Sequence, residues 1–448
     1  THKMCLSTIL KYSPKALQRI KNLIKGRDAF IVSGMPHKDD LAVADDLGVP
    51  VLSPEPDAAH LAGIDIPPSE SDIYSLDQLC ESLAQLVTEN LNVQRWLFKL
   101  NDEFDGRGIA FCDLPKYLHC YKWALKEEQR YGDNSICQNP AEIPDILQNY
   151  AQPVNSKMFP TWDQFLQAFL SQGGVIEACP PSENITTLTA DLLIEPSGAV
   201  NLLTCGDQIH ADSQFSCWGL SFPQSSIEPS ALNVTCQRIA DVCKSNGIVG
   251  YLKIDFVTFI HPKTMVQQLW ALDLSLHYSD HLAMFRLMEY VTHGTFHPKT
   301  HVFEVTLPTK ENKSSRRRLT EQSTPSKTRY AVMSTRLMHS NLAVIHYSVF
   351  FQMCRAHGIG YDIKDKSGTA FTLIDSFNRE RLGMLTIGED LQGALATFVR
   401  NLFIIHQEIS TPNMQGVTNF QAAIADIEHI LGTTVENAEA DQDVQTTQ

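Results

Sequence analysis

The sequence predicts an α/β protein in which a small α/β domain is followed by larger α+β domains. Residues 1–60 alternate short apolar runs with amphipathic stretches, a rhythm typical of parallel strand–helix–strand units. Residues 173–276 contain long stretches in which apolar and polar side chains alternate, a pattern typical of antiparallel strands. A single hydrophobic core stops growing at about 250–300 residues, so a chain of 448 residues is expected to hold several domains.

The first domain is expected to contain two helices and two strands. Pro14 suits the first turn of a helix, because a backbone N–H has no intrahelical partner there. The runs DAFIVSG and VPVLS are short and apolar, as buried parallel strands are. The expected elements are a helix over 13–26, a strand over 28–34, a helix over 38–48 and a strand over 49–53.

The middle of the chain predicts a helix, several strands and a hairpin. Leucines that share one helical face mark residues 75–89 as a helix. The sequence Glu195-Pro-Ser-Gly198 has the composition of a tight turn between two strands. Strands are expected over 94–100, 173–178, 186–194 and 199–205, and a helix over 229–246 precedes two long strands over 247–260 and 265–276.

The last third of the chain predicts a linker, a further α+β unit and a tail. Residues 308–328 have almost no large apolar side chain. Burial of this segment cannot offset the conformational entropy lost on ordering it, so we expect a flexible linker. Strands are then expected near 329–334, 369–374 and 382–387, and helices near 345–357 and 389–409. The predicted divisions are 1–60, 61–172 (a small subdomain), 173–307 (a large subdomain), 308–328, 329–432 (a C-terminal unit) and 433–448 (an acidic tail).

Charge and composition argue against several classes of protein. The formal net charge is −15, which disfavours a nucleic-acid partner because phosphate binding needs a concentrated field of Lys and Arg. The sequence has no apolar stretch of about 20 residues and no signal-peptide pattern at its start, so we expect neither a membrane protein nor a secreted one. Its eleven cysteines form no Cys-x-x-Cys pair and are expected to be reduced, as in the cytoplasm.

Lys99 and two nearby glycines form the first candidate site. Lys99 ends an expected strand and is followed by Gly106 and Gly108. A glycine-rich turn lets backbone N–H groups approach phosphate oxygens, and a lysine at a strand end supplies a fixed positive charge. The same pattern also occurs in ordinary turns, so phosphate binding and a plain turn both stay open.

Acidic residues form the second candidate site. Asp255 and Asp273 lie on the two arms of the expected hairpin, among apolar neighbours. Two carboxylates that face one another predict a divalent-cation site, and a pair of hydrogen-bonded core aspartates explains the pattern equally well. Glu177 ends a strand and could face a cleft in which an adenine would bind the adjoining backbone.

Taken in order, these stretches resemble an ATP-grasp fold preceded by a small α/β domain. The similarity lies in WLFKLNDEFDGRGIAFCDL (96–114), GGVIEACPPSENITTLTADLLIEPSGAVNLLTCGDQIHAD (173–212), VGYLKIDFV (249–257) and WALDLSL (270–276). The chain is also similar to the IQ-motif-containing protein H family over essentially its whole length. That similarity is carried by DDLAVADDLGVPVLSPEP (39–56), RWLFKLNDEFDGRGIAFCD (95–113), FFQMCRAHGIGYDI (350–363) and LGMLTIGEDLQGALATFVRNLFIIHQEIS (382–410).

The resemblance implies ATP and Mg²⁺ as cofactors and assigns a role to each candidate residue. It implies that Lys99 contacts the phosphates, that Gly106 and Gly108 cover them, that Glu177 marks the adenine hinge, and that Asp255 and Asp273 hold Mg²⁺. An active relative would activate a carboxylate as an acyl phosphate for attack by an amine.

The sequence departs from the pattern of that resemblance. Asp273 stands where glutamate is usual, Ser275 where asparagine is usual and His277 where arginine is usual. A hydroxyl is a poorer Mg²⁺ ligand than an amide oxygen, and histidine is largely neutral at pH 7. Between His60 and Gly63 the chain also lacks a longer segment with a second nucleotide-binding lysine.

These departures lead us to expect a non-catalytic ATP-grasp-like scaffold or regulatory component that could keep a nucleotide. The resemblance implies that the protein is located on the axoneme of cilia and of the sperm flagellum. It also implies axonemal partners, such as radial-spoke components. An active ATP-dependent carboxylate–amine ligase and a nucleotide sensor without chemistry are the alternatives. The stretch LQRIKNLIKGR (17–27) has Asn22 where an IQ motif needs a basic residue, so we expect calmodulin to bind only through a region outside this chain.

Overall fold

The computed structural model describes most of the chain. The described residues are 5–33, 38–52, 67–100, 108–119, 121, 126, 142–156, 158–182, 184–210, 215, 217–307, 326–373, 379–410 and 417–445. Within them no helix is both long enough and apolar enough to span a membrane.

Helices form mostly where an amphipathic stretch follows a capping side chain. Ser75, Thr161, Ser279 and Asp390 each accept a hydrogen bond from a backbone N–H in the first helical turn, which satisfies one of the unpaired donors at a helix start. The helices are α1 (Leu6–Lys11), α2 (Pro14–Ile24), α3 (Lys38–Leu47), α4 (Leu76–Glu89), α6 (Ile143–Tyr150), α7 (Trp162–Gln172), α8 (Pro229–Ser245), α9 (Asp280–Thr292), α10 (Tyr347–Ala356), α11 (Leu391–Ile409) and α12 (Phe420–Gln445), with short 3₁₀ turns η1 (Leu114–Lys116) and η3 (Ser340–Ala343).

The strands form three sheets, and every pairing within these sheets is antiparallel. Their orders are β1-β5-β2-β3-β4, β10-β9-β6-β7-β8-β14-β17-β16-β15 and β11-β12-β13. The strands are β1 (Ser69–Ile73), β2 (Trp96–Leu100), β3 (Ile109–Cys112), β4 (Gln152–Pro153), β5 (Gly174–Ala178), β6 (Ile185–Ile194), β7 (Val200–His210), β8 (Cys217–Phe222), β9 (Gly250–Ile260), β10 (Gln267–Ser275), β11 (Thr295–His297), β12 (Val302–Thr306), β13 (Ser326–Thr328), β14 (Tyr330–Met338), β15 (Tyr361–Asp362), β16 (Ser367–Leu373) and β17 (Arg381–Gly388).

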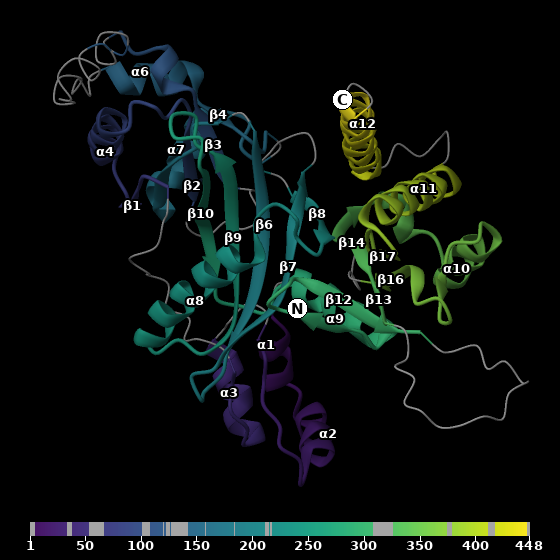
Figure 1. Ribbon diagram of the computed structural model, residues 1–448. Helices are drawn as coiled ribbons and strands as arrows, with labels where there is room; N and C mark the ends of the chain where they lie inside the picture. The colour runs from purple at the N-terminus through teal and green to yellow at the C-terminus, as the bar shows by residue number, and fades with distance from the viewer. Residues whose placement is uncertain are drawn as a thin grey trace, which may run out of the picture.

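The N-terminal unit keeps its predicted helices but not its predicted sheet. Over their described residues, the strands expected at 28–34 and 49–53 reduce to one parallel bridge between Ile31 and Val51. Phe30 is 56% exposed beside this bridge, so the expected strand does not bury this apolar side chain. Figure 1 shows α1, α2 and α3 together at the end of the molecule away from α4 and α6.

The small sheet is covered by α4, α6 and α7, which gather around it in Figure 1. Its core is aromatic: Phe98 on β2 makes edge contacts with Trp162 and Phe169 on α7, at centroid distances of 5.2 and 6.3 Å. Leu79 and Leu83 of α4 are fully buried in the same cluster. The helix predicted over 75–89 and the strand predicted over 94–100 are therefore present, and they bury the apolar faces on which the prediction rested.

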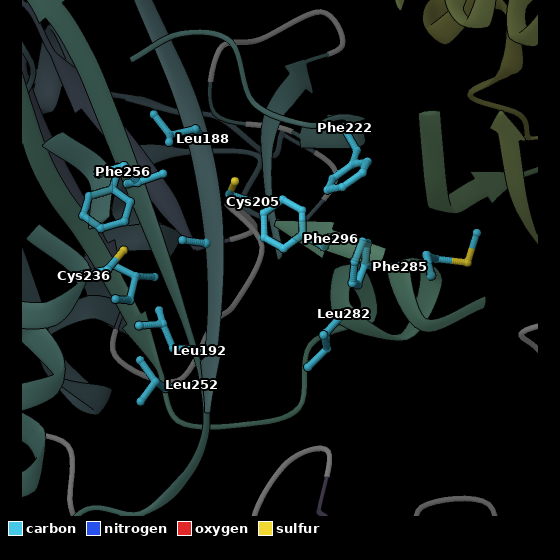
Figure 2. Close-up of a cluster of buried hydrophobic side chains, with 14 of the residues drawn as sticks. Leu188, Leu192, Cys205, Phe222, Cys236, Leu252, Phe256, Leu282, Phe285 and Phe296 are labelled. Atoms are coloured by element: carbon cyan, nitrogen blue, oxygen red, sulfur yellow. The ribbon is translucent and has the colours of Figure 1, made fainter. Parts of the chain in front are cut away.

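The nine-stranded sheet carries the largest core. Figure 2 shows Leu188, Leu192 and Leu252 beside Cys236 of α8, with Phe285 of α9 in the same cluster. Because neighbouring side chains on a strand point to opposite faces, these buried positions leave the alternate residues of β6 and β9 on the other face of the sheet. That other face carries the polar residues described below.

The C-terminal third is continuous with this sheet. β14 pairs with β8, and β17, β16 and β15 extend the sheet beyond it, so residues 329–432 belong to the same fold as the strands before them. On α11 the predicted apolar stripe is buried at Leu395, Phe398, Leu402 and Ile405. A side-chain hydrogen bond also joins α12 to the sheet. Trp218 Nε1 donates to Asp426 Oδ2 at 2.8 Å.

Two predicted boundaries need correction. The last three residues of the expected linker, 326–328, form β13, which pairs with β12 and so gains backbone hydrogen bonds that the apolar content did not reveal. Residues 308–325 lie outside the described part of the chain. The helix α12 runs to Gln445 and so includes most of the expected acidic tail.

Candidate functional site

The polar face of β9 is the centre of the candidate site. Leu252 and Ile254 are buried in the core, so Lys253 and Asp255 point to the opposite face of the sheet. Both side chains are largely shielded from solvent, with 17% of Lys253 and 18% of Asp255 exposed. The sequence alternation of this strand therefore places a lysine and an aspartate side by side on one face.

Asp255 and Asp273 face each other across the β9–β10 hairpin, as predicted. Their Cα atoms are register partners, and the pairing shifts between Ala271 and Asp273. Lys253 and Ser275 form the next cross-strand pair on the same face. A strand has a side-chain period of two, so these four residues form one compact polar group.

The carboxylate of Asp255 is fully engaged by neighbouring side chains. Lys253 Nζ lies 2.7 Å from Asp255 Oδ2. Thr189 Oγ1 and Gln208 Nε2 donate to Asp255 Oδ1 at 2.6 and 2.9 Å. Gln208 Nε2 also lies 2.8 Å from Thr189 Oγ1, so β6, β7 and β9 all contribute to holding this one carboxylate.

Charge interactions at the hairpin separate the pKa values of its two aspartates. Burial alone would raise the pKa of Asp255, but the charge and hydrogen bond of Lys253, the hydrogen bond of Thr189 and the charge of Arg336 together lower it. Burial raises the pKa of Asp273, and the charge of Asp255 raises it further. For Lys253 burial would lower the pKa, yet Asp255, Asp273 and Asp191 together raise it, so the ammonium form is favoured.

Lys99 and Glu177 form a second ion pair, in the small sheet. Lys99 Nζ lies 2.7 and 2.8 Å from the two carboxylate oxygens of Glu177. The Glu177 side chain is only 6% exposed and that of Lys99 is 22% exposed. Burial raises the pKa of Glu177, with Lys99 opposing and the charge of Asp273 adding to the increase. The charge of Asp273 thus connects this pair to the β9–β10 hairpin.

The structure tests the phosphate-loop and adenine-hinge predictions only in part. Gly106 lies outside the described residues, and Gly108 is buried, with its carbonyl accepting from Leu100 N at 2.9 Å. After Glu177, the N–H groups of Ala178 and Cys179 donate to the carbonyl oxygens of Pro68 and Arg95 at 2.8 and 2.9 Å. The two backbone N–H groups that follow Glu177 therefore already have acceptors within the protein.

The residues present do not fit a divalent cation well. Asp255 is held by Lys253, Thr189 and Gln208, and Ser275 Oγ donates to Asp273 Oδ2 at 3.2 Å. Across the described residues, no three or more His, Cys, Asp or Glu side chains are grouped so that they could hold a metal ion. The predicted juxtaposition of the two aspartates is confirmed, but their oxygens are arranged as acceptors of hydrogen bonds.

Several residues of the site were not singled out from the sequence. Lys253 precedes Asp255 by one strand period, and that spacing was a usable signal. Arg336 on β14 lies near enough to lower the pKa of Asp255, and its Nη1 donates to the carbonyl of Cys217 at 2.8 Å. No local pattern reveals this contact, because β14 and β9 are far apart in sequence.

Two histidines, one on the nine-stranded sheet and one on α9, have partners within the protein. His281 Nδ1 lies 2.7 Å from Asp191 Oδ2 in a pair that is at most 3% exposed. Burial lowers the pKa of His210 to about 4, and its Nε2 contacts Thr187 Oγ1. Asp207, which precedes Gln208, points to the other face and accepts from Ser225 N at 2.7 Å.

Comparisons with known proteins identify the family. The sequence model described as "IQCH-like, ATP-grasp" matches residues 59–299. The IQ motif-containing protein H of Danio rerio is 46% identical over 466 residues, which cover 99% of this chain and 43% of that protein. The chain therefore spans less than half the length of this relative.

A solved structure supports the fold class. The biotin carboxylase domain of the 2-oxoglutarate carboxylase of Hydrogenobacter thermophilus, in complex with MgADP, ADP and bicarbonate, superimposes with a TM-score of 0.50 at 12% identity. The match covers 92% of this chain and 81% of that one. At this identity the likeness shows the fold alone, and it confirms the α/β architecture of the ATP-grasp type. By its sequence, the chain belongs to the IQ motif-containing protein H family.

Proposed function

We propose that the chain is a non-catalytic ATP-grasp-like module that serves as a scaffold or regulatory component of the axoneme in cilia and the sperm flagellum. It acts through contacts with axonemal proteins, radial-spoke components among them. It retains the ability to bind ATP at the site of Lys99 and Asp255, without using it for ligation.

One observation carries the proposal that the module is not a catalyst. The charged groups expected to contact phosphates and a metal are paired with one another, Lys99 with Glu177 and Lys253 with Asp255. Separating a buried ion pair leaves an uncompensated charge, at a cost on the order of 3–5 kcal/mol. The part of the binding energy of ATP and Mg²⁺ that is used to separate these ion pairs cannot also stabilise a transition state.

A weak nucleotide site remains compatible with this geometry. The 22% exposure of the Lys99 side chain allows its ammonium group to exchange one carboxylate oxygen of Glu177 for a phosphate oxygen. Phosphate contacts would come from Lys99 and the backbone near Gly108. The engaged amides of Ala178 and Cys179 reduce the donors open to an adenine, which supports weak rather than tight binding.

The proposed location and partners are those that the resemblance to the family implies. The chain has a formal net charge of −15, which suits contacts with basic protein surfaces better than contacts with nucleic acid or an anionic membrane. We place the module in the cytoplasm and on the axoneme, and we place calmodulin binding in a region outside these 448 residues.

The second candidate is an ATP-dependent carboxylate–amine ligase. It is favoured by one observation, that Asp255 and Asp273 are register partners with Lys253 beside them and Lys99 close enough to act on the charge of Asp273. The ligase needs these groups to rearrange around Mg-ATP, because in the structure they neutralise one another.

Calorimetric titration of ATP with magnesium tests the nucleotide part of the proposal. We expect weak binding that Lys99→Ala abolishes, because it removes the cation that the proposal places against the phosphates. Lys263→Ala in the β9–β10 turn makes the same change in charge away from the site and should leave binding unchanged. Equal loss in both variants, or no binding by the wild type, would reject the nucleotide site.

The axonemal part needs a separate test. The full-length protein should remain with axonemes after detergent extraction of ciliated cells or sperm, and crosslinking should join it to axonemal proteins. Complete release with the soluble fraction would contradict the proposed location.

A further inference from the structure

We propose that the ammonium group of Lys253 takes the place of the divalent cation at Asp255 and Asp273, so that these two aspartates bind no metal ion. A second part, which rests on the proposed nucleotide binding, is that ATP binds to this chain without requiring magnesium. Lys253 thus occupies the position at which a divalent cation fits poorly.

The position of Lys253 is the first argument. It lies on the same face of β9 as Asp255, and its cross-strand partner Ser275 is two residues from Asp273 on β10. The four side chains occupy the same patch of the sheet, and Lys253 Nζ lies 2.7 Å from Asp255 Oδ2. A cation held by Asp255 and facing Asp273 is therefore already supplied by the chain.

The carboxylate oxygens of Asp255 and Glu177 already accept hydrogen bonds from neighbouring side chains. Asp255 Oδ2 accepts from Lys253, and Asp255 Oδ1 accepts from Thr189 and Gln208. Mg²⁺ demands near-octahedral geometry with oxygen ligands at about 2.0–2.1 Å, so it would have to compete with the Lys253 ammonium at Oδ2 or with two hydrogen-bond donors at Oδ1. Glu177, whose charge is coupled to that of Asp273, is held through both its oxygens by Lys99.

The electrostatics of the hairpin are the third argument. Lys253 Nζ lies 2.7 Å from Asp255 Oδ2, and only 17% of the Lys253 side chain is exposed, so its charge acts on the hairpin with little screening by solvent. A lysine ammonium is a compact point charge with three donors. It can therefore balance the charge of Asp255 and act on Asp273, whereas a divalent ion would have to lose bound water on entering the site.

Manganese binding measured by electron paramagnetic resonance tests the first part without any nucleotide. Mn²⁺ prefers the same oxygen ligands as Mg²⁺. The wild type should bind no Mn²⁺ at millimolar metal. Lys253→Met removes the tethered cation and should create a Mn²⁺ site at least about tenfold tighter than any in the wild type. Lys253→Arg keeps a cation and should bind none.

The opposite pattern overturns the proposal. Wild-type Mn²⁺ binding that Asp255→Asn abolishes would show that the aspartates hold a metal in the presence of Lys253. A folded Lys253→Met variant that binds no more Mn²⁺ than the wild type would show that Lys253 does not occupy the cation position. Circular dichroism checks folding, and the wild-type measurement decides the question if Lys253→Met is unfolded.

Nucleotide binding in EDTA tests the second part. A fluorescent ATP analogue should bind the wild type with the same affinity, within about twofold, in EDTA and in excess Mg²⁺. A magnesium dependence of about tenfold or more would overturn this part. Absence of nucleotide binding in both buffers would reject the proposed nucleotide site while leaving the manganese result to decide the role of Lys253.

Discussion

Lys253 and Asp255 are separated by one residue on β9, and their charged groups meet at 2.7 Å. This contact lies at the point where the fold was expected to hold a metal ion. In the small sheet, Lys99 is likewise paired with a carboxylate, that of Glu177. Both lysines of the site are held by the chain's own carboxylates, and the predictions below follow from that arrangement.

The Lys99–Glu177 pair should be strongly coupled. Lys99→Met leaves a buried carboxylate without its cation and should lower the free energy of unfolding by about 3–5 kcal/mol. Lys99→Met combined with Glu177→Gln removes both charges and should recover most of that loss. Urea denaturation of the two single variants and the double variant measures the coupling, and additive losses would show that the pair is not coupled.

Gly174 should not tolerate a side chain. A Cβ atom at this position would lie 2.6 Å from the backbone carbonyl oxygen of Lys99 and 2.2 Å from the ring of Phe169. Gly174→Ala should therefore lower the free energy of unfolding by about 1–3 kcal/mol and weaken nucleotide binding through the displaced Lys99 strand.

The matched control for that substitution is Gly432→Ala. Gly432 lies in α12 with nothing within 4 Å of its added Cβ, and alanine is about 1 kcal/mol better than glycine in a helix. Thermal denaturation should show equal or greater stability for this variant. A similar loss in both variants would mean that the contact with Lys99 is not the cause.

His301 should make stability depend on pH. It is 3% exposed, its Nδ1 accepts from Gln224 at 2.9 Å, and burial lowers its pKa from 6.5 to about 4. The unfolded chain then binds more protons below pH 6.5, so the contribution of this residue is complete above that pH and is lost as the pH falls toward 4. Between pH 7 and pH 5 the loss is about 2 kcal/mol.

Comparison with His301→Asn isolates this effect. His301 has a φ of +54°, a backbone conformation that asparagine tolerates, and asparagine keeps a donor and an acceptor. Chemical denaturation at the two pH values should show a smaller drop between pH 7 and pH 5 in the variant than in the wild type. Equal drops would mean that His301 is protonated in the folded protein.

The rate at which each cysteine reacts with a labelling reagent should depend on how deeply it is buried. Cys5 is exposed, whereas Cys236 is 2% exposed and burial raises its pKa to about 12. Because the thiolate is the reactive form, iodoacetamide should label Cys5 in the native protein and Cys236 only after unfolding. Mass spectrometry of native and denatured samples reads out both sites, and rapid native labelling of Cys236 would contradict the packing of α8.

The sequence identified those parts of the site that depend on local periodicity. Alternation along β9 and β10 was sufficient to predict that Asp255 and Asp273 face each other. The same alternation puts Lys253 beside them, but a lysine on a strand is usually a solvated residue, and its partner cannot be read from one strand. The pairing of Lys99 with Glu177 joins residues 78 positions apart and depends on tertiary structure.

The fold was predictable to a similar extent. Helices and hairpins with strong patterns were found, because their apolar faces are fixed by local spacing. The strands expected around Ile31 and Val51 form a single bridge, since a strand needs a neighbour and a packed face that local sequence does not provide. The continuity of β8 with β14 was likewise not visible, because it joins segments separated by more than 100 residues.

The most direct test of the account is release of ADP by the purified protein in Mg-ATP, supplied with mixed carboxylic acids and amines. A non-catalytic module should release no more ADP than a matched sample of Lys99→Ala, since its charged groups remain paired with one another. ADP release above that level, lost in both Lys99→Ala and Asp255→Ala and unchanged in Lys263→Ala, would show a working ligase and contradict the central claim.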